Sequence, residues 1–299
     1  MGTITVRLAK WAIKASAGTR FAGTGCGFGA DEVQLASTAP DERYRQALLE
    51  AEDAGRFLEM FGGIPLKGQR VLDFGCGYGG KTVEYARQAA FAAGIEPFPI
   101  MISLAREYGK WAHSSNVLFE VCPQDRIPFE DDSFDVVLSH DVLEHVDDPK
   151  VSLEEIHRVL KPGGKAYLVF PVYLGAMSHH LDYVSKFPGL HWFFSADTLV
   201  AAVNDMHRSD IPEQPAPKKR WWGDTKVLPM LNGLSGPEFR QIASSMFIVE
   251  RLDQNLIGAG GSSLAAKLFY WLASKPLSLS RGVARDLVTS NICAILRKG

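Results

Sequence analysis

The 299-residue sequence lacks several features that define special classes of protein. No run of apolar residues approaches the roughly 20 that an α-helix needs to cross a bilayer. The N-terminus has neither the apolar core nor the small-residue cleavage site of a secretory signal. No cysteine forms a CxxC pair, so a disulfide framework and a zinc site of that type are disfavoured; the four cysteines are Cys26, Cys76, Cys122 and Cys293. We therefore expect a cytoplasmic protein, with membrane association and organellar targeting as alternatives.

The net charge of −2 conceals an uneven distribution. Residues 1–30 contain four basic residues and no acid, residues 31–170 contain 24 acids and 14 bases, and residues 254–299 contain six bases and one acid. The basic ends and a basic–aromatic cluster at residues 218–222 favour peripheral contact with a membrane or a lipid-like partner. An acidic middle without a recognition motif argues against nucleic acid as a partner.

Hydrophobic periodicity predicts alternating strands and helices from residue 70 to residue 170, which is typical of a doubly wound α/β fold with a parallel sheet. The predicted strands are 71–74, 91–96, 117–121, 134–139 and 165–170, and the predicted helices between them are 81–90, 100–108 and 152–160. The last of these helices is followed by Lys161-Pro162-Gly163-Gly164, a helix stop signal.

Outside that region the pattern predicts three further parts. An amphipathic helix near residues 4–15 and a second helix from about residue 40 to 60 form an N-terminal extension and helical cap, residues 1–65. The core spans residues 66–172, and the alternation then stops in an insertion, residues 173–236. A helix from about 237, strands at 247–252 and 291–297 and an apolar helix at 264–273 make residues 237–299 a C-terminal completion of the sheet.

A glycine-rich segment follows the first predicted strand and opens a helix. Gly75, Gly77 and Gly80 satisfy the dinucleotide fingerprint GxGxxG, a pattern in which glycines allow the backbone to approach a ligand at a helix N-terminus. A nucleoside site also needs an acid at the end of the next strand to bind the ribose hydroxyls, and Glu96 stands there, 19 residues after Gly77. The two features, in this order, predict a nucleoside-binding site.

Four stretches of the chain together resemble the class I S-adenosylmethionine-dependent methyltransferases of the broad small-molecule group. They are residues 71–79, 94–106, 127–137 and 160–164, and the resemblance covers about residues 66–172. It implies a Rossmann-like seven-stranded sheet of order 3-2-1-4-5-7-6, with S-adenosylmethionine as the cofactor over the carboxyl ends of the first strands. The insertion after the fifth strand is then expected to cover the acceptor.

The same resemblance implies roles for individual residues. Asp73 would orient the loop, Glu96 would bind the ribose hydroxyls, and the loop around the methionine part comprises Gly75, Cys76, Gly77 and Gly79. Pro97 and Phe98 would flank the adenine, whereas Ser139 and His140 would face the methionine end. The family usually has an Asp near position 123 for the adenine amino group, and because Pro123 occupies it here, Gln124 or Asp125 would substitute.

Two histidines are predicted to act on the acceptor. His145 matches a position where several relatives keep a histidine, and its near-neutral pKa suits proton transfer; a histidine that only packs a turn is the alternative. His180, with His179 and Asp182, lies in the insertion. Aromatic residues of the insertion predict either an apolar acceptor pocket or a small hydrophobic core; they are Trp192, Phe193, Phe194, Trp221 and Trp222.

A metal site is not predicted. Asp141, Glu144 and His145 have DxxEH spacing, which on a helix would place Asp141 beside the other two. Some relatives bind a divalent ion with a related spacing, but Asp is shorter than Glu and no further ligand is evident. An acidic helix start is the preferred interpretation.

The sequence as a whole predicts a methyltransferase that acts on an apolar or lipid-like small molecule at oxygen, nitrogen or carbon. Two alternatives remain open: a non-catalytic module that binds S-adenosylmethionine, and an NAD(P)-dependent oxidoreductase that uses the GxGxxG pattern.

Overall fold

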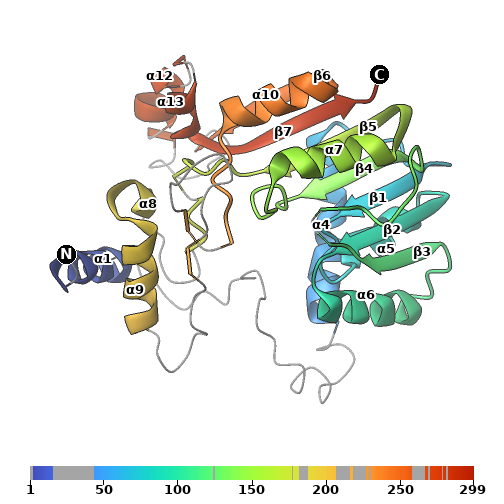
Figure 1. The fold of residues 1–299 in the computed structure, drawn as a ribbon, viewed down its shortest axis with the longest axis horizontal. Helices are drawn as coiled ribbons and strands as arrows, with labels where there is room; N and C mark the ends of the chain where they lie inside the picture. Colours follow the sequence, from blue (N-terminus) through green and yellow to red (C-terminus); the bar gives the residue numbers. More distant parts are fainter. Residues whose placement is uncertain are drawn as a thin grey trace.

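The computed structural model describes residues 3–15, 44–123, 125–176, 178–181, 188–206, 216–217, 227–228, 230–257, 267–268, 270–277, 279–280 and 282–299. A seven-stranded sheet dominates it, in the order β3-β2-β1-β4-β5-β7-β6, which confirms the predicted fold and strand order (Figure 1). The strands are β1 (Arg70–Phe74), β2 (Phe91–Glu96), β3 (Val117–Val121), β4 (Phe134–His140), β5 (Leu160–Phe170), β6 (Ile248–Leu256) and β7 (Thr289–Arg297).

Strand direction determines where a ligand can bind. The strands β1 to β5 pair in parallel, whereas β7 runs antiparallel to both β5 and β6. The strands β1 and β4 are neighbours, although β2 and β3 lie on one side of β1 and β5 on the other. The chain therefore reverses its progress across the sheet beside β1 and β4, and in such sheets the ligand site lies at the carboxyl ends of these strands.

Helices cover both faces of the sheet and bury its apolar side chains. The helices α4 (Arg45–Met60), α5 (Gly80–Ala86) and α6 (Pro99–Trp111) lie on one face, where Phe57 and Tyr85 pack over β1 and β4. The helices α7 (Pro149–Val159) and α10 (Gly236–Met246) cover the other face, where Ile156 and Phe239 join the largest buried cluster. Burial on both faces explains why the central strands read as continuous apolar runs.

Two predicted boundaries near the sheet were wrong. The helix α5 ends at Ala86 rather than residue 90, because the side-chain amide of Asn116 donates hydrogen bonds to the carbonyl oxygens of Ala86 and Ala89 and so stabilises a turn there. Residues 161–164 belong to β5 rather than to a loop before it. They form a bulge, since Phe134 pairs with Leu160 whereas Val136 pairs with Lys165.

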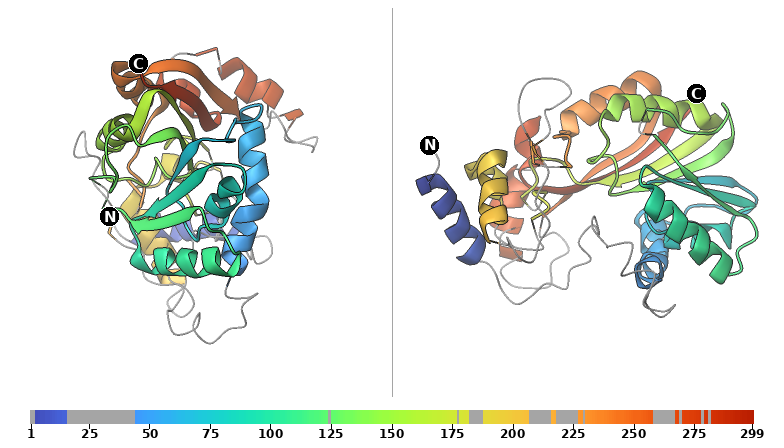
Figure 2. Two further views of the ribbon diagram at one scale, coloured as in Figure 1. Left: turned by 90° about the vertical axis from the view of Figure 1, so that its right-hand side faces the viewer. Right: turned by 60° about the horizontal axis from the view of Figure 1, so that its bottom comes forward.

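A smaller cluster lies away from the sheet. The helix α1 (Thr3–Ala15) packs against α9 (Ala196–Met206), and Ala9, Ile13 and Leu199 are fully buried between them. The short helix α8 (Leu190–Phe193) adjoins them, and Figures 1 and 2 show the three at the end of the molecule remote from β3. The two helices of the N-terminal extension therefore separate: α1 joins the insertion, and α4 packs on the sheet.

The remaining helices are short, namely the π-helix η1 (Tyr270–Ser274), α12 (Lys275–Leu277) and α13 (Val283–Asp286). Of the apolar helix predicted at 264–273, residues 267–268 are α-helical and residues 270–273 belong to the π-helix η1, whereas the other four lie outside the described residues. Within the described part of the chain, no helix is both long enough and apolar enough to cross a membrane.

Candidate active site

A cleft of about 670 Å³ opens at the carboxyl ends of β1, β2 and β4. That volume is within the range of small-molecule sites. The structure brings seven of the predicted site residues into its lining, namely Gly75, Gly77, Glu96, Pro97, Phe98, His140 and His145. The walls also include residues of α4, the turn after β4 and Met230 of the insertion.

The glycine-rich loop adopts backbone conformations that other residues rarely take. Gly75, Gly77 and Gly79 all have positive φ angles, of 81°, 56° and 84°. A Cβ atom on Gly75 would lie 2.3 Å from a methyl group of Val142, and one on Gly79 would lie 2.8 Å from the ring of Phe119. The loop can therefore keep this path only with glycine at these positions.

Glu96 lies at the end of β2 with its carboxylate directed at the loop. Its Oε2 atom accepts a hydrogen bond from the backbone N–H of Gly77 at 3.3 Å. The side chain is buried, and burial raises the pKa of Glu96 to about 7. A buried acceptor at the wall of a cleft is suited to bind hydroxyl groups of a ligand.

Glu50 of α4 is a site residue that the sequence interpretation missed. Its carboxylate accepts hydrogen bonds from the backbone N–H groups of Tyr78 (3.1 Å) and Gly80 (3.0 Å), at the start of α5. Burial raises the pKa of Glu50 to about 7, although both hydrogen bonds oppose that shift. An acid on the helix face that carries Ala47, Ala54 and Phe57 was the available signal, because that face is otherwise apolar.

Asp73 and Cys76 lie behind the loop rather than in the cleft wall. Asp73 accepts a hydrogen bond of 2.6 Å from the hydroxyl of Thr82 in α5, and burial raises the pKa of Asp73 to about 6. This hydrogen bond joins the end of β1 to α5, the two elements that flank the loop, and the role of Asp73 in orienting the loop stays a prediction. Cys76 and Ser139 are buried too, so neither faces the cleft.

Three charged side chains surround His140 at the end of β4, namely Lys81, Asp53 and Asp141. Lys81 donates a hydrogen bond from Nζ to Nδ1 of His140 at 2.9 Å, and Asp53 Oδ2 lies 3.7 Å from the same Nζ atom. Since Nδ1 accepts, Nε2 carries the proton and lies 3.6 Å from Oδ2 of Asp141. Burial lowers the pKa of His140, and Lys81 lowers it further, so the ring is neutral near pH 7.

Only some of the residues predicted to surround an adenine lie at the cleft. Pro97, Phe98 and Met101 line the cleft beyond Glu96. Asp125 is exposed and does not line it, because the chain turns after β3, where Arg126 N–H donates to the carbonyl of Pro123 at 3.3 Å, and this turn carries Asp125 outward. Gln124 lies outside the described residues.

The turn after β4 contributes His145 to the cleft wall and keeps Glu144 buried behind it. The side-chain amide of Asn232 donates to the carbonyl oxygens of Leu143 (2.7 Å) and Val146 (3.0 Å), and its backbone N–H donates to that of Glu144 (2.9 Å). The predicted helical face is wrong, since residues 141–146 are not helical and Asp141 has a φ of 56°. The carboxylate of Asp141 consequently lies beside His140, with Oδ2 3.6 Å from Nε2 of that ring.

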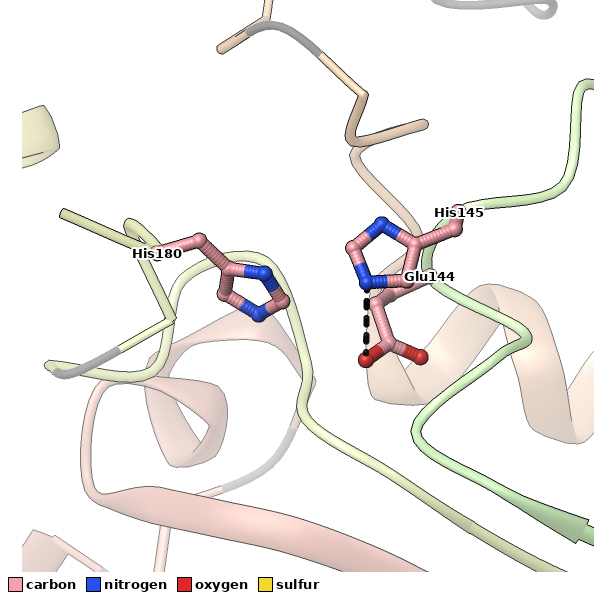
Figure 3. Close-up of side chains that lie close together, drawn as sticks. All are labelled: Glu144, His145 and His180. Carbon is pink, nitrogen blue, oxygen red and sulfur yellow. Dashed lines mark ion pairs between the residues drawn. The ribbon is translucent and has the colours of Figure 1, made fainter. Parts of the chain in front are cut away.

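His180 does not line the cleft but packs beside His145, with 5.0 Å between ring centroids (Figure 3). Burial lowers the pKa of His180 to about 3. His179 is buried and accepts a hydrogen bond on Nδ1 from the backbone N–H of Leu181, which is a structural contact. Asp182 lies outside the described residues.

Among the described residues of the insertion, the aromatic side chains singled out from the sequence do not form its buried core. Leu190, Leu199 and Leu228 do so with residues of α1, whereas Trp192 and Phe193 are exposed and Phe194 packs only at the margin. None of the three lines the cleft. Trp221 and Trp222 lie outside the described residues.

Comparisons with known proteins agree with this geometry. A family model described as a methyltransferase domain matches residues 72–168. An uncharacterized methyltransferase of Mycobacterium sp. (strain JLS) is 31% identical over 199 residues, covering 55% of this chain and 71% of that protein. A ubiquinone biosynthesis O-methyltransferase of Xylella fastidiosa (strain 9a5c) is 33% identical over 105 residues, covering 35% of this chain and 43% of that protein.

Among solved structures, an S-adenosylmethionine dependent methyltransferase from Mesorhizobium loti has a TM-score of 0.50 at 16% identity. The alignment covers 82% of this chain and 97% of that one, and shows a shared fold.

Proposed function

This chain belongs to the class I S-adenosylmethionine-dependent methyltransferases, and from that premise we propose that it methylates an oxygen of an apolar or lipid-like small molecule. One observation carries the proposal: a single cleft joins the glycine-rich loop and Glu96 to His145, so a cofactor and an acceptor can meet inside it. The relative from Xylella fastidiosa, named for O-methylation in ubiquinone biosynthesis, supports oxygen as the methylated atom.

The residues of the cleft fit S-adenosylmethionine. The backbone of the glycine-rich loop borders the cleft at Gly75 and Gly77, and Glu96 offers a buried carboxylate for ribose hydroxyls. Pro97, Phe98 and Met101 provide an apolar surface for a purine ring. When bound, S-adenosylmethionine supplies an electrophilic methyl group on a positively charged sulfonium.

The protein residues around His140 would orient the methionine end. Lys81 is a cation suited to a carboxylate, and Asp53 and Asp141 are anions suited to an amino group or a sulfonium. Because methyl transfer is an in-line displacement, holding the two reactants in register accounts for much of the rate that a protein can supply.

His145 is the residue that we propose promotes loss of the acceptor's hydroxyl proton, and His180, which packs beside it, would position its ring. His145 Nδ1 donates a 2.7 Å hydrogen bond to the carbonyl oxygen of Met230, so the lone pair of the ring is on Nε2. Both His145 and Met230 line the cleft, which agrees with an acceptor that enters beside the insertion.

An exposed apolar surface supports an acceptor that is delivered from a membrane. On α1, Ile4, Leu8 and Trp11 are 74%, 54% and 68% exposed, next to the basic Arg7 and Lys14. The C-terminal helices add further exposed apolar side chains, and the ammonium group of Lys275 lies over one of their rings; these side chains are Leu268, Trp271, Leu272 and Leu279. Aromatic and basic residues together favour the surface of an anionic bilayer.

The transfer assay that tests the proposal uses S-adenosylmethionine with a radiolabelled methyl group and a cell extract divided into organic-soluble and aqueous fractions. We expect label in the organic-soluble product, and we expect His145→Ala to reduce it about 100-fold or more. Label only in the aqueous fraction would contradict an apolar acceptor. Cofactor binding without transfer to any fraction would instead favour a non-catalytic binding module.

Vesicle sedimentation tests the membrane contact separately. The double variant Leu8→Ala/Trp11→Ala should bind vesicles of anionic lipid several-fold less than the natural sequence does. Trp111→Ala is the matched control, because Trp111 is also exposed but lies on α6 and stacks on Tyr108. Equal binding by the double variant would remove the support that α1 provides.

A further inference from the structure

Glu144 is a buried acidic residue that has no role in the proposed function. Its side chain is 3% exposed, and both carboxylate oxygens are buried without a hydrogen-bond partner. Burial raises the pKa of Glu144 well above its usual value. A buried carboxylate without donors is costly unless it binds a proton or a cation.

Two imidazole rings converge on this carboxylate from different parts of the chain. His145 follows Glu144 in the turn after β4, whereas His180 comes from the insertion, and Figure 3 shows the three side chains pointing toward one another. One ligand atom from each of the three lies within 4.8 Å of the others. Oε1 of Glu144 is 3.6 Å from Nε2 of His145.

The orientation of His145 is the one that a metal ligand needs. Its Nδ1–H donates to the carbonyl oxygen of Met230, which fixes the tautomer and leaves the Nε2 lone pair directed at Glu144. Asn232 holds the turn through three hydrogen bonds to backbone carbonyl oxygens, and His180 adopts a positive φ of 51°. Residues far apart in the sequence thus hold this group of side chains in place.

We propose that Glu144, His145 and His180 form a binding site for a divalent transition-metal ion of the zinc type. Two imidazoles and one carboxylate suit Zn²⁺ or a similar ion, whereas Mg²⁺ prefers oxygen ligands. A tetrahedral site with bonds near 2.1 Å places its ligand atoms about 3.4 Å apart. The 3.6 Å separation of Glu144 and His145 is already close to that value.

The DxxEH spacing did not reveal this site, because the set of side chains is different. Asp141 points to His140, and the third ligand is His180, 35 positions beyond His145. Of the three side chains, His145 lines the cleft, whereas Glu144 and His180 line a small space behind it, so an acceptor hydroxyl would reach an ion at this site beside the His145 ring. Resting on the proposed function, such an ion would lower the pKa of that hydroxyl, and the proton would pass to solvent.

Metal binding can be tested on the full chain without cofactor or acceptor, so failure of this test is distinct from failure of the proposed function. Chelator-treated protein is titrated with Zn²⁺ against a competing chromophoric chelator, and with Co²⁺ while its visible absorption is recorded. We expect one ion per chain and Co²⁺ bands of a four- or five-coordinate site, with no binding of Mg²⁺ at the same concentrations.

Glu144→Gln and His180→Ala should each weaken Zn²⁺ binding by about 100-fold or more. His191→Ala is the matched control, because His191 lies in the same insertion and its ring packs on His179, outside the proposed site; its affinity should stay within about threefold of the natural protein's. Absence of Zn²⁺ binding, or binding that Glu144→Gln and His180→Ala leave unchanged, would overturn the site.

Thermal unfolding distinguishes a variant that has lost the metal site from one that does not fold. Glu144→Gln removes a buried carboxylate but keeps its volume, so the metal-free variant should melt at or above the temperature of the metal-free natural protein. Zn²⁺ should raise the melting temperature of the natural protein and not that of the variant. The same increase in both proteins would show that the ion binds elsewhere.

Discussion

The two ends of the cleft are built on different principles. At the cofactor end, Glu96 and the glycine-rich loop lie on adjacent strands, and the carboxylate is hydrogen-bonded to the backbone N–H of Gly77. At the acceptor end, Glu144 and His145 depend on Asn232 and Met230, roughly 90 residues away, and the carboxylate of Glu144 has no hydrogen-bond partner. One end is encoded locally and the other by long-range contacts.

This difference teaches where function can vary within such a fold. Loop conformation and the acid at the end of β2 are fixed by backbone geometry, so the cofactor end tolerates little change. The acceptor end draws on the insertion and on α1, whose cluster is separate from the clusters that cover the sheet. The following changes in sequence or pH should separate the two ends experimentally.

The largest expected effect follows from Gly75→Ala. The added Cβ would meet Val142 at 2.3 Å in a backbone conformation that alanine rarely adopts, so the loop must shift. We expect S-adenosylmethionine affinity to fall about 100-fold in isothermal titration. Gly163→Ala is the control, because Gly163 also has a positive φ but has nothing within 4 Å of an added Cβ and lies outside the cleft.

A second substitution, Val142→Ala, separates the steric clash at Gly75→Ala from the backbone strain. In the Gly75→Ala background it removes the methyl groups that the new Cβ would meet but leaves the backbone strain. Partial recovery of affinity is expected. If the double variant bound S-adenosylmethionine as weakly as Gly75→Ala does, or if Gly75→Ala alone lost no affinity, the loop would not be fixed by this contact.

The next largest expected effect is a pH dependence of the free energy of unfolding that comes from the cofactor end. The folded-state pKa values of Glu50 and Glu96 are raised to about 7, so each group contributes stability at pH 4.5 that is lost as pH rises through 7. The loss is at most about 3 kcal/mol for each group. Denaturant unfolding of the cofactor-free protein between pH 4.5 and 7.5 measures it.

The double variant Glu50→Gln/Glu96→Gln should lose this decrease in stability, whereas Glu154→Gln, on the exposed side of α7, should leave it unchanged. Asp73 changes stability in the same direction, whereas the lowered pKa values of His180 and His191 make stability rise with pH, and these contributions remain in the double variant. A double variant whose pH profile matches that of the natural sequence would contradict the burial of these carboxylates.

Packing of α1 should affect only the acceptor end. Ile13 is fully buried against α9, and Ile13→Ala should weaken the local packing by about 2–4 kcal/mol. Hydrogen exchange should then rise in α1 and α9, with cofactor affinity unchanged. Ile4→Ala on the exposed face of the same helix should change neither, and an equal increase of exchange in β1 would contradict the separation of the two clusters.

The smallest effect is expected from the ion pair between Lys10 and Asp205, which links α1 to α9. Lys10→Gln should cost less than about 1 kcal/mol, because the pair is partly exposed and screened by water. Hydrogen exchange in α1 at low and high salt measures the difference. A larger loss than that of Ile13→Ala would mean that charge rather than apolar packing holds the helix.

The same contrast determines how much could be predicted from the sequence. The strand order is implied by the resemblance to the methyltransferases, and the structure has that order. The loop and Glu96 follow from motifs that act over about 20 residues, and both line the cleft. The outward turn of Asp125, the hydrogen bonds of Glu50 to the loop and the separation of α1 from α4 depend on contacts between distant segments. Periodicity and spacing carry no information about such contacts.

Titration calorimetry with S-adenosylmethionine tests the central claim, that the cofactor binds at the locally encoded end of the cleft. The natural protein should bind one molecule per chain, Glu96→Ala should lose about 30-fold in affinity, and Glu144→Gln should stay within about threefold of the natural protein. The account would be contradicted by a protein that binds NAD(P)H and not S-adenosylmethionine, or by Glu96→Ala binding as tightly as the natural sequence.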